Sequence, residues 1–245
     1  MPTIFDILDR LAWLRGGPAV AVVLAAAVVA LGVWGIGLSR RGGAAALPFA
    51  PLAFPALLVV YLVGGLLLIE VLDPRLAVVY VLTGVVIALI VLLTGTQTRW
   101  GRLPPGLTPA EAARLGRPQP RTAGPLLFTN RALLRLGLSL AVIAGALWLA
   151  RTPDTLLAFV PEGKAYLEAA VFGLAGLGLV GVVASPEPLP AGVGLLLFLF
   201  AFALFYSMVD PSIIMVIALI LLQLTVALVA AYLAQARALP VDILD

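Results

Sequence analysis

The residues that could do chemistry gather at one short stretch of the chain and at a distant counterpart. Glu70, Asp73 and Arg75 lie where one long apolar segment ends and the next begins. Asp210 lies at a second junction of the same kind, and a proline follows it as one follows Asp73. Because an ionisable side chain in a membrane segment can relay a proton or bind a partner, these four residues are candidates for an ion path or a partner contact.

Each of these charged residues also has a structural interpretation. Glu70 is close to the end of its apolar segment, where a carboxylate paired with Arg75 can stay at the membrane interface. Asp73 and Asp210 precede helix-opening prolines, so their carboxylates can accept hydrogen bonds from free N–H groups in the next turn. The sequence leaves both interpretations open.

Three polar side chains lie much deeper in apolar segments: Thr83, Gln223 and Thr225. In lipid such groups either hydrogen-bond to a neighbouring helix or line a polar path. No Asp, Glu, Lys, Arg or His lies near the middle of any long apolar segment. A complete proton or ion pathway within this chain alone is therefore not expected.

Composition restricts the fold class. The chain is 63% hydrophobic and 11% charged, whereas soluble domains are about half apolar and about a quarter charged. This excess indicates an all-α polytopic bundle in a membrane. The chain has no Cys and no His, which excludes disulfides, thiolate chemistry and His-ligated haem or zinc. We expect no catalytic residues, no metal, no cofactor and no enzymatic activity.

Seven segments are long enough to cross a bilayer, which takes roughly 20 mostly apolar residues. They are Pro18–Leu38, Pro51–Leu72, Arg75–Gly95, Ala132–Ala150, Ala165–Ala184, Pro190–Val209 and Ser212–Ala236. Residues 1–17 have apolar positions at helical spacing with charges between them. This pattern favours an amphipathic helix in the interface, with a solvated leader helix and a cleaved signal peptide as alternatives.

Charge in the connecting segments predicts the orientation. Residues 96–131 hold six arginines against the single acid Glu111, together with many prolines. The positive-inside rule makes this segment cytoplasmic. Counting spans then places the tail 237–245 inside, and the N-terminus and both Asp-Pro turns outside. Arg10 and Arg15 oppose this orientation. We expect a multi-pass protein of the cell inner membrane without nucleic-acid partners.

The two Asp-Pro junctions suggest an internal duplication. Pro51 and Asp73 are each followed, 137 positions later, by the same residue type, at Pro188 and Asp210. Residues 18–95 and 165–236 would form two three-helix units, with span 132–150 between them. That extra crossing gives both units the same orientation, a parallel 3+1+3 repeat. Identities beyond the shared dipeptides are few.

Small residues indicate helix packing. Gly176, Gly178 and Gly181 have the spacing of a dinucleotide-binding fingerprint, yet they lie inside an apolar span without a preceding strand. Gly137 and Gly145 lie with Ala141 on one stripe of the fourth span. Both sets are typical of close contacts between membrane helices.

The last apolar hairpin resembles a known family. Residues 204–237, followed by Leu-Pro-Val-Asp-Ile-Leu at 239–244, are similar to the C-terminal end of component E of membrane-bound hydrogenases. The three-helix units also resemble the small K-type membrane subunit of complex I. That subunit carries glutamates deep in two helices, and this chain has none at matching depth. The resemblance therefore implies a scaffold or interface subunit rather than a proton channel.

Three functions follow as hypotheses. The first is a non-catalytic integral subunit of an ion-translocating respiratory or antiporter-like complex, associated with proton translocation and packed beside a large antiporter-type subunit through the Gly/Ala faces of spans four and five. The alternatives are a stand-alone small-molecule permease that binds substrate among Thr83, Gln223 and Thr225, or a membrane structural or assembly protein.

Overall fold

The computed structural model describes residues 17–33, 50–98, 130–149, 157, 160, 165–185 and 188–238. These residues form seven helices and no strand. The helices are α2 (Gly17–Val33), α3 (Ala50–Ile69), α4 (Pro74–Gln97), α6 (Asn130–Leu149), α7 (Ala165–Ala184), α8 (Pro188–Val209) and α9 (Ile213–Ala238). The interfacial helix predicted for residues 1–17, most of the arginine-rich segment and the tail beyond Ala238 lie outside the described residues.

Each helix coincides with a predicted apolar segment because a backbone in lipid must satisfy its own hydrogen bonds. The junction between α3 and α4 has the predicted cap. Pro74 opens α4, and the Asp73 carboxylate accepts from the backbone N–H of Arg75 at 2.8 Å. The α8–α9 junction differs, because α9 begins only at Ile213 and its first turn is closed by the N–H of Val216 donating to the carbonyl of Ser212 at 3.1 Å.

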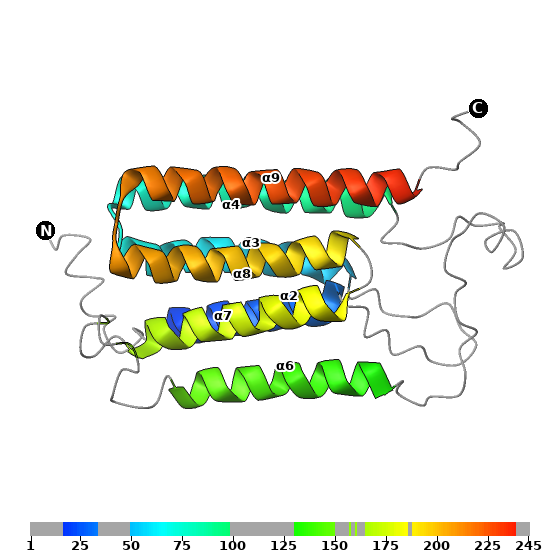
Figure 1. The fold of residues 1–245 in the computed structure, drawn as a ribbon, viewed down its shortest axis with the longest axis horizontal. Helices are drawn as coiled ribbons and strands as arrows, with labels where there is room; N and C mark the ends of the chain where they lie inside the picture. The colour runs from blue at the N-terminus through cyan, green and yellow to red at the C-terminus, as the bar shows by residue number, and fades with distance from the viewer. Residues whose placement is uncertain are drawn as a thin grey trace, which may run out of the picture.

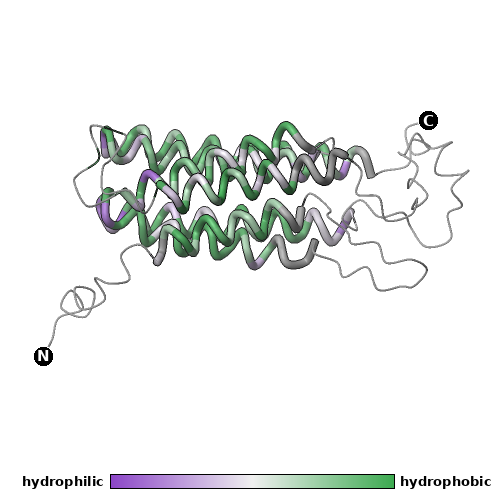
Figure 2. Tube along the Cα trace, turned by 90° about the horizontal axis from the view of Figure 1, so that it is seen from below, coloured by the Kyte–Doolittle hydropathy of each residue, from purple (hydrophilic) through white to green (hydrophobic). Residues whose placement is uncertain are grey.

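Four of the described helices are long and apolar enough to cross a membrane: α4, α7, α8 and α9. The described apolar stretches of the other three are shorter, at Ala19–Ala30, Phe54–Ile69 and Leu136–Leu149. The chain is thus a helical bundle of membrane type. Hydropathy supports this, because apolar residues run along the helices while hydrophilic ones gather towards their ends (Figure 2).

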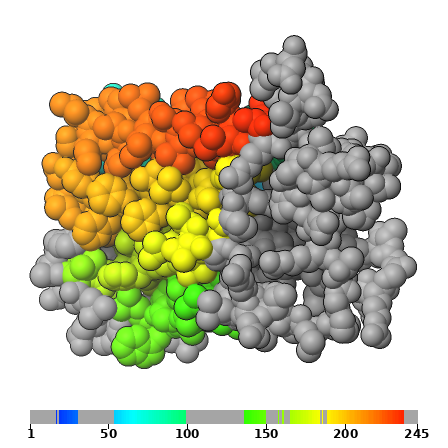
Figure 3. All heavy atoms as spheres, turned by 45° about the vertical axis from the view of Figure 1, so that its right-hand side comes forward, coloured from blue at the N-terminus to red at the C-terminus, as the bar shows by residue number. Residues whose placement is uncertain are grey.

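The helices stack in pairs (Figure 1). α4 lies beside α9, α3 beside α8 and α2 beside α7, while α6 packs outside the last pair against α7 and α2. α3 and α8 run in one direction, and α4 and α9 run in the other, so both Asp-Pro turns lie at the same end of the bundle. The space-filling view shows this order on one face, with α9 above α8 and α7 and α6 below (Figure 3).

Burial follows the stacking order. Within their most apolar windows, α7 and α8 are 61% and 56% buried, whereas α4 and α9 are 33% and 28% buried. The core is therefore centred on α2, α3, α7 and α8, and includes Val22, Leu57, Leu174 and Leu197. The outer faces of α4 and α9 are apolar and exposed, as expected where the surrounding solvent is lipid.

Candidate functional site

A polar cluster lies buried where α3, α4, α8 and α9 meet. The Tyr61 hydroxyl donates to Oε1 of Gln223 at 3.2 Å, and Nε2 of Gln223 donates to the hydroxyl of Tyr80. The ring of Phe200 covers the pair, with centroids 5.2 Å from Tyr61 in an edge-on arrangement and 5.6 Å from Tyr80. We call these four residues the tyrosine–glutamine cluster.

Two glycines make this cluster possible. A Cβ at Gly64 would meet the ring of Phe200, and a Cβ at Gly84 would meet the ring of Tyr61. The missing side chains let α3 and α4 approach the aromatic rings directly. All four cluster residues are at most 2% exposed. The cluster is consequently a packed layer in which aromatic rings seal the hydrogen bonds from lipid.

The chemistry of the cluster is neutral hydrogen bonding. Gln223 uses its carbonyl oxygen and its amide nitrogen on two different helices, which ties α9 to α3 and α4 in one register. Hydrogen bonds between membrane helices stabilise by about 0.6 kcal/mol on average and by up to about 2 kcal/mol. The arrangement suits a rigid structural contact between the first and second halves of the chain.

The other two deep polar candidates do not join Gln223. The Thr83 hydroxyl donates to the carbonyl of Val79 at 2.9 Å, and the Thr225 hydroxyl donates to the carbonyl of Leu221 at 2.8 Å. Each of these bonds stays within its own helix, α4 for Thr83 and α9 for Thr225. Thr225 is exposed on the outside of α9. The three residues therefore do not converge on a common binding site.

The charged candidates of the first hairpin lie at the end of the bundle. Glu70 is exposed, and its carboxylate accepts a hydrogen bond from the Tyr166 hydroxyl at the start of α7. Asp73 caps α4, and Arg75 is exposed in the first turn of that helix. These three residues share one turn, which links α3 to α7 through Glu70.

A second carboxylate, that of Glu168 in α7, is not one of the candidates predicted from the sequence. Glu168 is 0% exposed, although its sequence position favours an interfacial side chain. Its Oε1 accepts from the backbone N–H of Leu157 at 2.6 Å. This hydrogen bond from Leu157 partly offsets the cost of burying the carboxylate.

The second hairpin uses its polar residues differently. Asp210 is exposed and accepts a 3.4 Å hydrogen bond from the Tyr206 hydroxyl within the same turn. Ser207, which lies where the first hairpin has Glu70, is buried and donates to the carbonyl of Ala203 at 2.7 Å. No contact with another helix is involved in either bond. The acidic link to α7 is a property of the first hairpin.

Sequence reasoning found Gln223 but missed its partners. Tyr61 and Tyr80 lie far from Gln223 in the chain, and nothing in their local sequence pairs them with it. The available signal was the tyrosine hydroxyl itself, because a buried Tyr in lipid needs a hydrogen-bond partner. Tyr166 carried the same signal for Glu70.

Comparisons with protein-family models, with curated proteins and with solved structures found no match to this chain.

Proposed function

We propose that the chain is a non-catalytic integral membrane subunit of an ion-translocating respiratory or antiporter-like complex, of the kind related to complex I and membrane-bound hydrogenases. The observation that carries this proposal is the tyrosine–glutamine cluster. The deepest polar groups bind one another and are covered by Phe200. A rigid contact of this kind favours a role as a scaffold over a role as an ion path.

The charge distribution agrees with a scaffold. No charged side chain lies near the middle of any apolar segment, so a proton crossing this chain would find no charged side chain to carry it in the middle of the membrane. The charged candidates Glu70, Asp73 and Arg75 lie at one end of the bundle. In this proposal the ion path belongs to the partner subunit, and this chain supports it.

The proposal includes seven spans and a parallel 3+1+3 repeat. The proposal is supported by the contacts of α2 with α7 and of α4 with α9, which are the corresponding helices of the two units. The common direction of α4 and α9 supports like-oriented units. The arginine-rich segment 96–131 and the tail 237–245 would be cytoplasmic, and the N-terminus outside, in a cell inner membrane.

The contacts of the glycines restrict the face that could bind the partner. A Cβ added at Gly173 would lie 2.7 Å from a methyl of Val23, and one added at Gly176 would lie 2.7 Å from a methyl of Val142 in α6. A Cβ added at Gly178 would lie 2.6 Å from the backbone nitrogen of Phe198 in α8. The glycine face of α7, which the sequence offered to a partner, is therefore used within the chain.

The fourth span keeps an open small-residue face. A Cβ at Gly137 or at Gly145 would meet nothing within 4 Å. Ala141 and Ala144 are exposed on the same helix. The large subunit would pack on this face of α6, because small residues let membrane helices approach closely.

Purification of the full chain from its native membrane in mild detergent tests the proposal. A stable complex with antiporter-type or redox subunits is the expected result, and a lone monomer or homodimer would overturn it. Gly145→Leu should release the partner while the chain itself stays folded. Leu93→Trp, a change at an exposed position of α4, is the control and should leave the complex intact.

A stand-alone permease and a membrane assembly protein are the alternative functions. The permease would bind its substrate among Thr83, Gln223 and Thr225, and no contact among the described residues brings these three together. The assembly protein would bind its partner transiently and would separate from it during purification.

A further inference from the structure

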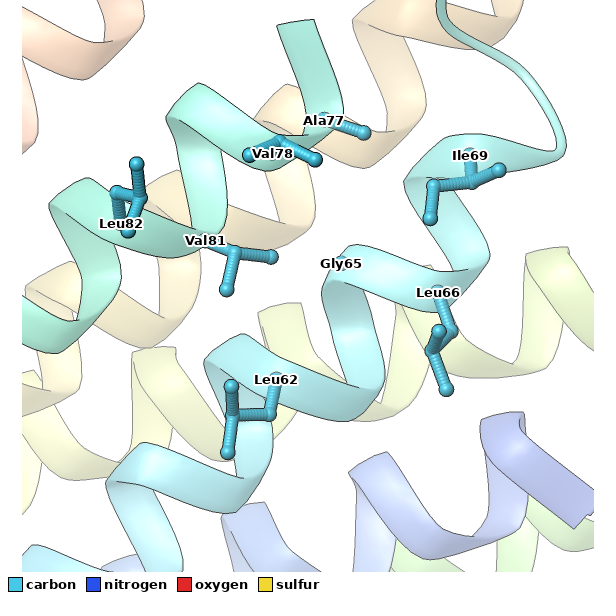
Figure 4. A pocket seen from close by; sticks show the side chains of 8 residues that line it. All are labelled: Leu62, Gly65, Leu66, Ile69, Ala77, Val78, Val81 and Leu82. Carbon is cyan, nitrogen blue, oxygen red and sulfur yellow. The ribbon is translucent and has the colours of Figure 1, made fainter. Parts of the chain in front are cut away.

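An apolar groove runs along the first hairpin between α3 and α4 (Figure 4). It has a volume of about 230 Å³ and is open to the outside of the bundle. The side chains along it are Leu62, Leu66 and Ile69 from α3, and Val78, Val81 and Leu82 from α4. We call it the α3–α4 groove.

A glycine produces the groove. Gly65 has no side chain between Leu62 and Leu66, and a methyl of Val81 lies where its Cβ would be. The two helices therefore meet closely at this floor, while the larger residues stand beside it. Leu66 and Leu82 are 56% and 61% exposed. The groove covers about two turns of each helix, roughly 12 Å at a rise of about 1.5 Å per residue.

An arginine precedes the groove residues on α4. Arg75 is one turn before Val78 on α4, at the level of the polar Asp-Pro turn. Within the described part of the chain, its guanidinium makes no hydrogen bond or ion pair. The neighbouring acids have their own partners, since Asp73 accepts from a backbone N–H and Glu70 from Tyr166. The guanidinium is thus available to an anionic group.

The second hairpin has neither the glycine nor the arginine. Counted from the shared Asp-Pro dipeptides, the position of Gly65 is occupied by Phe202 and that of Arg75 by Ser212. The glycine and the arginine therefore occur together in the first hairpin and are both replaced at the matching positions of the second, which argues that they act on one ligand.

We propose that the α3–α4 groove and Arg75 bind one phospholipid, with an acyl chain in the groove and the phosphate on the guanidinium. Arginine suits this role because its fork of donors matches the oxygens of a phosphate. Packed helices lie about 8–10 Å apart, and an acyl chain is slender enough to lie in the groove between α3 and α4.

The headgroup follows from the charges at the turn. Two carboxylates, Glu70 and Asp73, lie within five residues of Arg75 in the turn between α3 and α4. A purely anionic lipid would meet this excess of negative charge. A zwitterionic headgroup places its phosphate on Arg75 and its ammonium towards the acids, so the expected ligand is a phosphatidylethanolamine.

Native mass spectrometry of the full chain in detergent tests this, with palmitoyl-oleoyl phosphatidylethanolamine as the probe. The chain should retain one lipid, and Arg75→Gln should weaken retention about tenfold, because charge-assisted hydrogen bonds are lost. Arg75→Lys should recover most of the affinity. The corresponding diacylglycerol, which has no phosphate, should bind about as weakly as the lipid binds Arg75→Gln. Equal binding of both lipids, or an unchanged Arg75→Gln variant, would overturn the headgroup assignment.

Groove variants test the acyl chain. Val78→Trp fills the groove and should weaken retention about tenfold, while Leu89→Trp, three turns further along the same exposed face of α4, should have no effect. If Val78→Trp fails to fold, Leu66→Trp replaces it. Equal retention by the filled variant and its control would refute binding in the groove. A photo-crosslinking residue at Leu66 in native membranes should capture lipid, and capture of a polypeptide instead would also refute it.

Discussion

At the scale of single residues, Gln223 is central to the interior because the oxygen and the nitrogen of its side-chain amide bind two different tyrosines. Its amide serves Tyr61 through oxygen and Tyr80 through nitrogen. A buried polar group without a partner costs roughly 1–3 kcal/mol. Gln223 is therefore stabilising because it satisfies two hydroxyls at once, and each hydroxyl depends on it.

Gln223→Leu should lower the free energy of unfolding by about 1–2 kcal/mol, because two buried tyrosine hydroxyls lose their partner. Equilibrium unfolding in mixed detergent micelles measures this. Thr225→Val, two positions away on the same helix, is the control and should change little, since its hydroxyl bonds only to the backbone of its own helix. Replacing Tyr61 and Tyr80 by Phe in the Gln223→Leu background should recover part of the loss. Equal effects of Gln223→Leu and Thr225→Val would contradict the role of the cluster.

Glu70 and Tyr166 form the second contact between distant segments. A double-mutant cycle of Glu70→Ala and Tyr166→Phe should give a coupling energy of at least about 0.5 kcal/mol, because each change removes the same hydrogen bond. The cycle of Asp210→Ala and Tyr206→Phe is the matched control. Its hydrogen bond is 3.4 Å long and exposed, so its coupling should be near zero. Additive effects of the first pair would show that the contact is not energetically important.

At the scale of helices, glycines divide into two groups by what surrounds them. Gly64, Gly84 and Gly178 lie against a ring or a backbone of another helix, while Gly137 and Gly145 face open space. The first group holds the bundle together through close approach. The second group lies on α6, the helix at the edge of the stack, and marks a surface that the chain does not cover itself.

Gly84→Ala should destabilise the bundle by about 1–3 kcal/mol, because the new methyl overlaps the ring of Tyr61 and a packed core accommodates it poorly. Gly145→Ala adds the same methyl in open space and should leave stability unchanged or raise it by up to about 1 kcal/mol, because alanine is the better helix former. Thermal unfolding in one detergent compares the pair. A loss from Gly145→Ala as large as that from Gly84→Ala would mean that α6 packs differently from the arrangement described.

The positions of the helices were predictable from the sequence because lipid requires long apolar segments, and the Asp-Pro junction marks the start of α4 at Pro74 as expected. The inward faces were not predictable. Helices in lipid are apolar all round, so no polar stripe marks the outside. The partners of Gln223 and the burial of Glu168 depend on how helices distant in sequence pack, which no local pattern records. The start of α9 at Ile213, two residues after Pro211, was not predicted either.

At the scale of the whole molecule, the α3–α4 and α8–α9 junctions lie at the same end of the bundle. Two like-oriented units present the same end of both hairpins to the same side of a membrane, whereas an inverted pair would support alternating access, the arrangement common in transporters. The common direction of α4 and α9 favours like orientation (Figure 1). The side of the membrane on which each turn lies therefore distinguishes a parallel repeat from an inverted one.

The chain has no cysteine, so single cysteines can report on this directly. Asp73→Cys and Asp210→Cys should both react with a membrane-impermeant maleimide added to intact cells, because both turns lie at the end predicted to be outside. Gln97→Cys and Gln235→Cys should react only after the cells are permeabilised, since the side chains of Gln97 and Gln235 are hydrogen-bonded to each other at the opposite ends of α4 and α9. Labelling of the two turns from opposite sides would refute the parallel repeat. Labelling of both turns only from the inside would keep the repeat and reverse the predicted orientation, because the charges of Arg10 and Arg15 would then outweigh those of segment 96–131.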